Sequence, residues 1–142
     1  MTSDWLFWAV LSAIFAALTA IFAKIGLGNV DPDLATLLRT FIILGVLALI
    51  VSLAGKWSNP FALSPHTWLF LALSALATGA SWVCYFHALK IGEAAKVATV
   101  DKLSLVLVAV FAFLFLHERP SPKEWVGILV VAAGLIMLVW KR

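Results

Sequence analysis

An acid and a base, Asp101 and Lys102, stand next to each other inside an apolar run that extends from Val97 to Leu116. Insertion of a charged side chain into a membrane costs roughly 2.5–3.5 kcal/mol, so such residues are candidates for function. A desolvated carboxylate can exchange a proton near neutral pH, although a nearby cation opposes this. Asp101 is therefore a candidate for proton coupling or for contact with a cation. Lys102 is a candidate counter-charge, or a contact for an anionic substrate group.

Helix geometry predicts that this pair is separated. Adjacent positions on a helix point about 100° apart, so we expect Asp101 and Lys102 each to need its own partner or water. Ser104 lies three residues after Asp101 and shares its face. The alternative is structural: Lys102 extends to the membrane surface and Asp101 lies in the headgroup region.

A face of hydroxyl groups is the second candidate, in the apolar segment Trp68–Leu89. Its members follow one another at steps of four, three and four residues and so share one side of a helix. They are Ser74, Thr78, Ser81 and Tyr85. Such a face either lines a hydrated substrate path or forms hydrogen bonds between helices, and we favour the path. Trp82 in the same segment either lines a cavity or packs between helices.

Other polar and small residues are secondary candidates. Arg39, in the second apolar segment, and His87, near the end of the third, could serve the path, but extension toward the membrane surface is the favoured alternative. Gly127 and Gly134 are seven residues apart on one helical face. That spacing suits close helix packing or a contact between subunits, and the alternative is a face that is exposed to lipid.

Composition identifies the class of chain that must position these residues. Of 142 residues, 64% are hydrophobic and 12% are charged, whereas soluble domains have about 25% charged residues. The chain is therefore predicted to be an integral membrane protein. Its net charge of +3 is carried mainly by loops and ends and forms no nucleic-acid patch.

Five segments approach the roughly 20 apolar residues that a membrane-spanning helix requires. We predict an all-α protein with five transmembrane helices in a single domain, residues 1–142. The expected helices cover residues 5–25, 34–54, 68–89, 97–116 and 123–140. Helix-start signals support these boundaries: Asp31-Pro32, Ser64-Pro65 and the capping box of Ser121 and Glu124.

The distribution of basic residues gives only a weak preference for orientation. Lys56, Arg119 and Lys123 fall on the side of the N-terminus, and six others fall on the opposite side. The latter are Lys24, Arg39, Lys90, Lys96, Lys141 and Arg142. Lys24 and Arg39 lie at helix edges. Without them, three basic residues remain on the side of the N-terminus and four on the opposite side. So weak a bias permits insertion in both orientations.

Signals for enzyme chemistry are missing from the sequence. It has no histidine–cysteine metal spacing, no glycine-rich phosphate loop and no supported Ser/His/Asp set. We therefore predict no catalytic residues, no metal ion and no cofactor, and a protein that is not an enzyme.

With the segments placed, the chain resembles a single EamA-type unit of the drug/metabolite transporter superfamily, in its five-helix bacterial and archaeal branch. The resemblance covers nearly the full length. The resemblance rests on the segments Phe22–Gly26, Leu38–Thr40, Tyr85–Gly92, Phe115–Arg119, Trp125–Gly127 and Ala133-Gly134. The chain departs from many fused members at Asp101–Ser104, where they have a Glu-Pro or similar pair, and it lacks the helix-one glutamate of the related four-helix carriers.

The resemblance implies one half of an inverted-repeat transporter bundle, with the first, third and fourth helices lining a central path. It also implies a secondary transporter of small metabolites, such as amino acids, that works as an antiparallel homodimer or with a sister subunit. The expected location is the cytoplasmic (inner) membrane, in contact with lipid. The alternatives are a non-transporting accessory or assembly subunit and a carrier of lipid-linked substrates.

Overall fold

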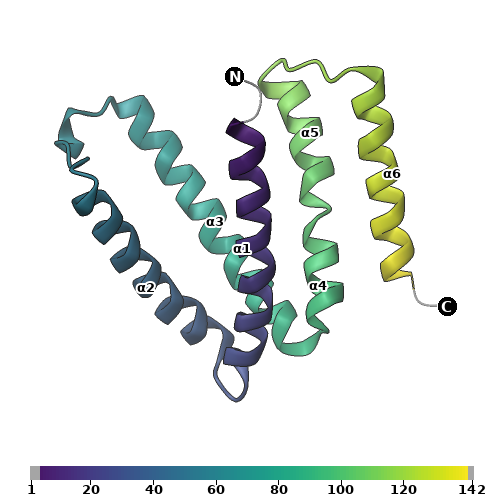
Figure 1. The fold of residues 1–142 in the computed structure, drawn as a ribbon, viewed down its shortest axis with the longest axis horizontal. Coiled ribbons are helices and arrows are strands. Elements are labelled where there is room, and N and C mark those ends of the chain that lie inside the picture. Colours follow the sequence, from purple (N-terminus) through teal and green to yellow (C-terminus); the bar gives the residue numbers. More distant parts are fainter. Residues whose placement is uncertain (1–3, 141–142) are drawn as a thin grey trace. The chain divides into compact units, whose positions relative to one another are not determined.

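The computed structural model describes residues 4–140, except the side chains of Asp4 and Val139, and the regular elements in this range are helices. Figure 1 shows their order along the chain. The helices are α1 (Asp4–Leu27), α2 (Pro32–Leu53), the short 3₁₀ helix η1 (Pro60–Ala62), α3 (Pro65–Ile91), α4 (Ala94–Asp101), α5 (Ser104–Phe115) and α6 (Pro122–Val139). All five predicted segments therefore overlap helices of the structure.

Four stretches of the described residues are long and apolar enough to cross a membrane. They are Trp5–Leu27, Pro32–Leu53, Pro65–Ile91 and Ala94–Phe115. The last of these joins α4 and α5. α6 extends over 18 residues and stays a predicted fifth span. The chain is a multi-pass membrane protein with helical spans, as its composition indicated.

Local capping explains where two of these helices begin. Asp31 Oδ1 accepts hydrogen bonds from the backbone N–H groups of Asp33 and Leu34 at 2.9 and 3.2 Å, and Pro32 opens α2. At α6, Ser121 Oγ accepts from Glu124 N at 3.4 Å, and Glu124 Oε2 accepts from Ser121 N at 2.6 Å. The predicted capping box is therefore confirmed, and it satisfies N–H groups that a helix start leaves unpaired.

The fourth predicted helix is not continuous. We expected one helix over residues 97–116, but α4 ends at Asp101 and α5 begins at Ser104. The N–H groups of Lys102 and Leu103 donate to the carbonyls three residues earlier, Thr99 O and Val100 O, at 3.1 and 2.9 Å. These are 3₁₀-type bonds, which tighten the turn and interrupt the regular α-helical bonding.

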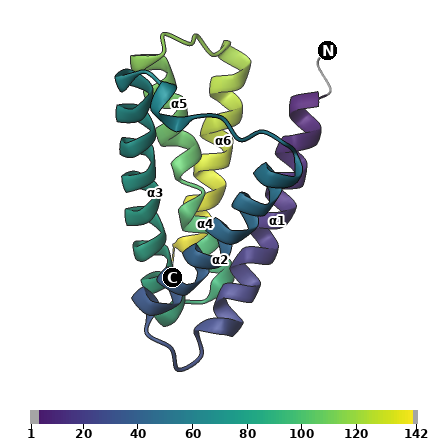
Figure 2. The ribbon, with the colours of Figure 1, turned by 90° about the vertical axis from the view of Figure 1, so that its left-hand side faces the viewer.

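The chain divides into two compact units, one of residues 21–91 and one of residues 1–20 with 92–142. In the first unit, α2 and α3 pack side by side and run in opposite directions (Figures 1 and 2). Its buried residues gather where the end of α1, the start of α2 and the end of α3 meet. They are Leu27, Pro32, Thr36, Phe86 and Leu89.

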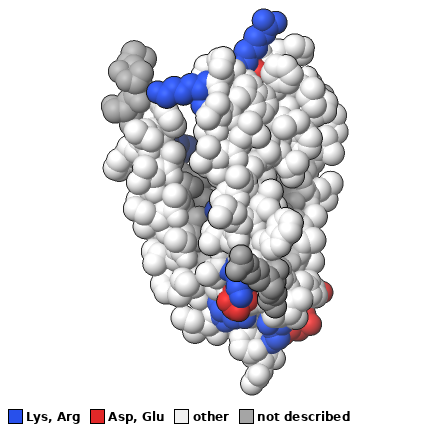
Figure 3. Space-filling model, turned by 90° about the vertical axis from the view of Figure 1, so that its right-hand side faces the viewer, with Lys and Arg blue, Asp and Glu red and all other residues white. Residues whose placement is uncertain are grey.

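In the second unit, α6 returns along both α5 and α4, and packs against each of them. Figure 3 shows the face that carries α6, where charged side chains gather toward the ends and the surface between them is mostly uncharged. Large apolar side chains on this unit are widely exposed, among them Val108 at 63% and Leu129 at 63%. Such a surface requires lipid or another protein to cover it.

Candidate functional site

The interruption between α4 and α5 carries the charged pair that the sequence singled out. Lys102 and Leu103 form the turn, and Ser104 is the first residue of α5. The carbonyls of Lys102 and Leu103 accept from Leu105 N and Val106 N at 3.0 and 3.1 Å, again three residues apart. Interrupted helices at membrane depth are the places where transporters bind substrates and ions.

Within this turn, Asp101 and Lys102 contact each other, which corrects the expectation that they would not. Lys102 Nζ lies 3.4 Å from Asp101 Oδ2. Because Lys102 follows the last residue of α4 as its C-cap, it no longer occupies a regular helical position. The contact is long, and 39% of the Asp101 side chain and 50% of the Lys102 side chain stay exposed. Both groups therefore keep surface for a ligand.

A second polar cluster lies in the other unit, between α2 and α3. The guanidinium carbon of Arg39 lies 4.5 Å from the centre of the Trp82 ring and 5.5 Å from the Phe86 ring. Trp82 therefore packs between two helices, under a cation, which was one of its two predicted roles. Cation–π attraction stabilises the Arg39 guanidinium over these rings. Its extension toward the membrane surface stays a prediction.

His87 and Asp33 form an ion-pair contact at the end of the same two helices. His87 Nε2 lies 2.9 Å from Asp33 Oδ1, and more than half of each side chain is exposed. Arg39 forms no ion pair with any carboxylate among the described side chains. The rings of Trp82 and Phe86 therefore supply contacts for its charged guanidinium.

The hydroxyl face of α3 is largely exposed. Thr78 Oγ1 donates to Ser74 O at 2.9 Å, so this hydroxyl is satisfied within its own helix. Ser74 and Ser81 are exposed, and Tyr85 is half-buried. The role of this face in a substrate path stays a prediction.

Two lysines connect the ends of α1 and α3 in a way that sequence reasoning missed. Lys24 Nζ, in the last turn of α1, donates to Leu89 O. Lys90 Nζ, in the last turn of α3, donates to Leu27 O at 3.2 Å, to Val30 O at 3.0 Å and to Gly28 O. We call this arrangement the lysine clamp. A basic residue in the last turn of each helix was the available signal, because such residues satisfy terminal carbonyls.

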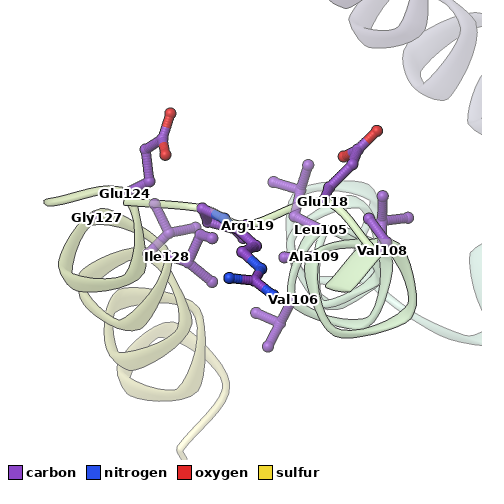
Figure 4. A pocket seen from close by; sticks show the side chains of 12 residues that line it. Leu105, Val106, Val108, Ala109, Glu118, Arg119, Glu124, Gly127 and Ile128 are labelled. Atoms are coloured by element: carbon purple, nitrogen blue, oxygen red, sulfur yellow. The ribbon is translucent and has the colours of Figure 1, made fainter. Parts of the chain in front are cut away.

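A cavity of about 630 Å³ lies between α5 and α6 in the unit that contains them. Its lining is mainly apolar: Leu105, Val106, Val108, Ala109, Ala112, Gly127, Ile128 and Val131, with Glu118, Arg119, Pro120 and Glu124 at one end. Figure 4 shows the Arg119 side chain directed between the two helices, whereas the carboxylates of Glu118 and Glu124 point the opposite way. We call this feature the α5–α6 groove.

The chain turn before the groove explains the position of Arg119. His117 has a positive φ of 57°, which ends α5 and turns the chain. Glu118 N then donates to Ala112 O at 3.2 Å. Glu124 lies in the first turn of α6, and its carboxylate accepts hydrogen bonds from the backbone N–H and the hydroxyl of Ser121.

The glycines of α6 have room around them. In the described part of the chain, a Cβ built at Gly127 or Gly134 would meet no atom within 4 Å. Neither glycine is therefore in close contact with another helix among the described residues, and Gly127 lines the groove between α5 and α6. A subunit contact at this face stays a prediction.

These features define a multi-pass helical membrane protein with an interrupted span and intramembrane charges. The model of the EamA-like transporter family matches residues 3–140. The chain belongs to this family of transporters, as its sequence motifs predicted.

Proteins with similar sequences support this family assignment. The chain is 55% identical over 138 residues to an uncharacterized transporter in the cobO 3′ region of a Sinorhizobium species, covering 97% of this chain and 98% of that protein. It is 28% identical over 137 residues to the uncharacterized transporter YxxF of Bacillus subtilis, covering 95% of this chain but 42% of that protein.

A third relative has a more specific name. The chain is 28% identical over 104 residues to the probable 4-amino-4-deoxy-L-arabinose-phosphoundecaprenol flippase subunit ArnE of Salmonella paratyphi B, covering 66% of this chain and 91% of that protein. No solved structure matches the chain.

Proposed function

We propose that this chain is one half of a secondary transporter for small metabolites in the cytoplasmic membrane. A second copy inserted in the opposite orientation, or a sister subunit, completes the inverted-repeat bundle. The 42% coverage of YxxF supports this proposal, because a chain of this size corresponds to less than half of that transporter. The exposed apolar faces of the helices give a second chain a surface to pack against.

The observation that carries the proposal is the interruption of an apolar span at a charged pair. Ala94–Phe115 is long and apolar enough to cross the membrane, yet its helix is broken at Lys102 and Leu103, beside Asp101. Charges inside spans face cavities or partners because lipid solvates them poorly. This turn is therefore the proposed site of substrate binding or proton coupling.

The charged groups favour amino acids or related compounds as substrates. The Asp101 carboxylate can bind an ammonium group, and the Lys102 ammonium can bind a carboxylate. Arg39, which lacks a carboxylate partner among the described side chains, offers a second cationic group. Ser74, Thr78, Ser81, Tyr85, Trp82, His87 and Ser104 are proposed to lie along the path.

Transport by purified protein in proteoliposomes tests this function. We expect uptake of at least one compound in a panel of radiolabelled acidic, basic, aromatic and aliphatic amino acids. Asp101→Asn should lower that uptake about tenfold or more, since a charge-assisted hydrogen bond contributes ~1.5–3 kcal/mol. The matched control is Glu93→Gln, which changes an exposed acid just before α4 that also contacts a lysine.

If no compound of the panel is taken up, the proposal of a transporter for small metabolites is contradicted. Full activity of Asp101→Asn, with unchanged pH dependence, would remove Asp101 from the mechanism. Co-purification with one foreign partner in fixed stoichiometry, without transport, would favour an accessory or assembly subunit.

A second candidate function is supported by the similarity to ArnE. A protein with that name is a subunit of a flippase for a lipid-linked sugar, and the similarity extends over 66% of this chain. On this alternative, the chain forms part of a carrier for lipid-linked substrates. Movement of a fluorescent polyprenyl-phosphate sugar between leaflets of the same proteoliposomes would distinguish it from amino-acid uptake.

A further inference from the structure

We propose that the α5–α6 groove binds an amine-bearing phospholipid of the surrounding membrane, of the phosphatidylethanolamine type. The groove begins next to the Asp101–Lys102 turn, at Leu105 and Val106, but its proposed headgroup contacts lie at the other end of α5. The proposal does not depend on the transport proposal. Its chemistry follows from three properties: an apolar cavity, an inward-directed guanidinium and carboxylates at the same end.

The cavity has the size and lining that an acyl chain requires. Its volume of about 630 Å³ lies within the range of roughly 300–1,000 Å³ that is usual for ligand sites. Leu105, Val108 and Val131 line it and are 54%, 63% and 45% exposed. An acyl chain in the groove would cover these side chains.

Arg119 supplies the contact for a phosphate group. Figure 4 shows its guanidinium between the two helices, on the side away from the neighbouring carboxylates. No ion pair of Arg119 is present among the described side chains. Guanidinium groups bind phosphate through two parallel hydrogen bonds, so a phosphate at the end of an acyl chain suits this position.

The carboxylates supply the selection for an amine. Glu124 already accepts hydrogen bonds from the backbone N–H and hydroxyl of Ser121, at 2.6 and 2.9 Å. Glu118 is exposed, and its carboxylate points away from the groove. A lipid with its chain in the groove and its phosphate on Arg119 would extend its amine outward, toward Glu118. An anionic headgroup without an amine would meet carboxylate repulsion there.

A competition experiment tests the site. The purified full-length protein is mixed in detergent with equimolar dioleoyl phosphatidylethanolamine, phosphatidylcholine and phosphatidylglycerol, and bound lipid is counted by native mass spectrometry. We expect phosphatidylethanolamine to dominate. Arg119→Gln should lower its apparent affinity about tenfold, and Glu118→Gln should reduce its preference over phosphatidylglycerol.

Two controls separate binding from folding. Lys123→Gln removes a charge near the same helix end without changing a groove residue and should leave binding unchanged. Gly127→Leu fills the groove, in which a Cβ has space, and should reduce binding of the lipid chain without changing either charge. Helical circular dichroism of each variant confirms that it is folded.

Three outcomes would overturn the proposal. Equal binding of the three lipids by the unchanged protein would indicate ordinary lipid contact with an apolar surface. Preference for phosphatidylglycerol would exclude selection of an amine. Normal binding by folded Arg119→Gln or Gly127→Leu would place the lipid elsewhere on the molecule.

Discussion

Arg39 shows, at the scale of a residue, how a cation is kept inside an apolar helix without a carboxylate partner. It is the eighth residue of α2, about 10 Å from the helix start at 1.5 Å per residue. The ring of Trp82, 4.5 Å away, supplies the compensating negative face. The sequence revealed both residues as candidates, but not their contact, because their pairing depends on the packing of α2 against α3.

Removal of this stacking should loosen the α2–α3 pair. We expect Trp82→Leu to lower the free energy of unfolding by about 1 kcal/mol more than Trp5→Leu, since a cation–π contact contributes ~0.5–2 kcal/mol. Trp5 is a suitable control because 68% of it is exposed. Unfolding of the detergent-solubilised protein by sodium dodecyl sulfate measures both. Equal losses in the two variants would show that the stacking adds no stability.

The lysine clamp gives a second test at this scale. Lys90→Met keeps a long side chain but removes the donors to Leu27 O, Gly28 O and Val30 O. We expect the free energy of unfolding to fall by about 1–2 kcal/mol, because carbonyls lose charge-assisted partners in a partly buried place. Lys56→Met, on an exposed residue after Gly55, is the control and should change stability little. A Lys90→Met protein as stable as this control would contradict the clamp.

At the scale of elements, helix starts were predictable and the helix interruption was not. Asp31-Pro32 and the capping box of Ser121 and Glu124 act through local hydrogen bonds. Their residue types alone therefore predict where these helices begin. The break at Lys102 and Leu103 contains no glycine or proline, so nothing in the local sequence predicts it. The Arg119 position in the groove was hidden for a similar reason, since it depends on the turn at His117.

One substitution in the turn after α5 should raise the stability of the protein. His117 has a φ of 57°, a conformation that costs most L-residues roughly 1–2 kcal/mol and glycine little. We expect His117→Gly to raise the free energy of unfolding by about 1 kcal/mol. His117→Ala retains the backbone strain and should give no gain, which makes it the matched control. Thermal unfolding in detergent compares the two variants, and an equal effect of both would refute the backbone explanation.

At the scale of the whole molecule, apolar side chains are exposed along every candidate span. Few residues of these spans are buried within the chain, and the buried apolar residues among those that the structure describes are Ala20, Leu27, Pro32, Phe86 and Leu89. The membrane class and the family were accessible from composition and motifs, because both are properties of one chain. The complete substrate path was not, since the proposed bundle requires contacts with a second chain.

Orientation is the measurement that belongs to this scale. We expect reporters that are active only in the cytoplasm and only in the periplasm to give comparable signals when fused, separately, after Arg142. The reason is the weak bias of basic residues, to which Lys141 and Arg142 contribute from outside the described residues. Signal from one side alone would exclude an antiparallel homodimer and require a sister subunit of opposite orientation.

The lysine clamp has a consequence for gene duplication in such a protein. Lys24 and Lys90 hold helix ends together, so their replacement damages the fold in either orientation. Lys56 and Lys123 are both exposed, and among the described residues their ammonium groups form no hydrogen bond. After duplication, a few changes at such exposed lysines could fix the two copies in opposite orientations while both keep the clamp. A dual-orientation ancestor could thus divide into two dedicated partners without passing through an unstable form.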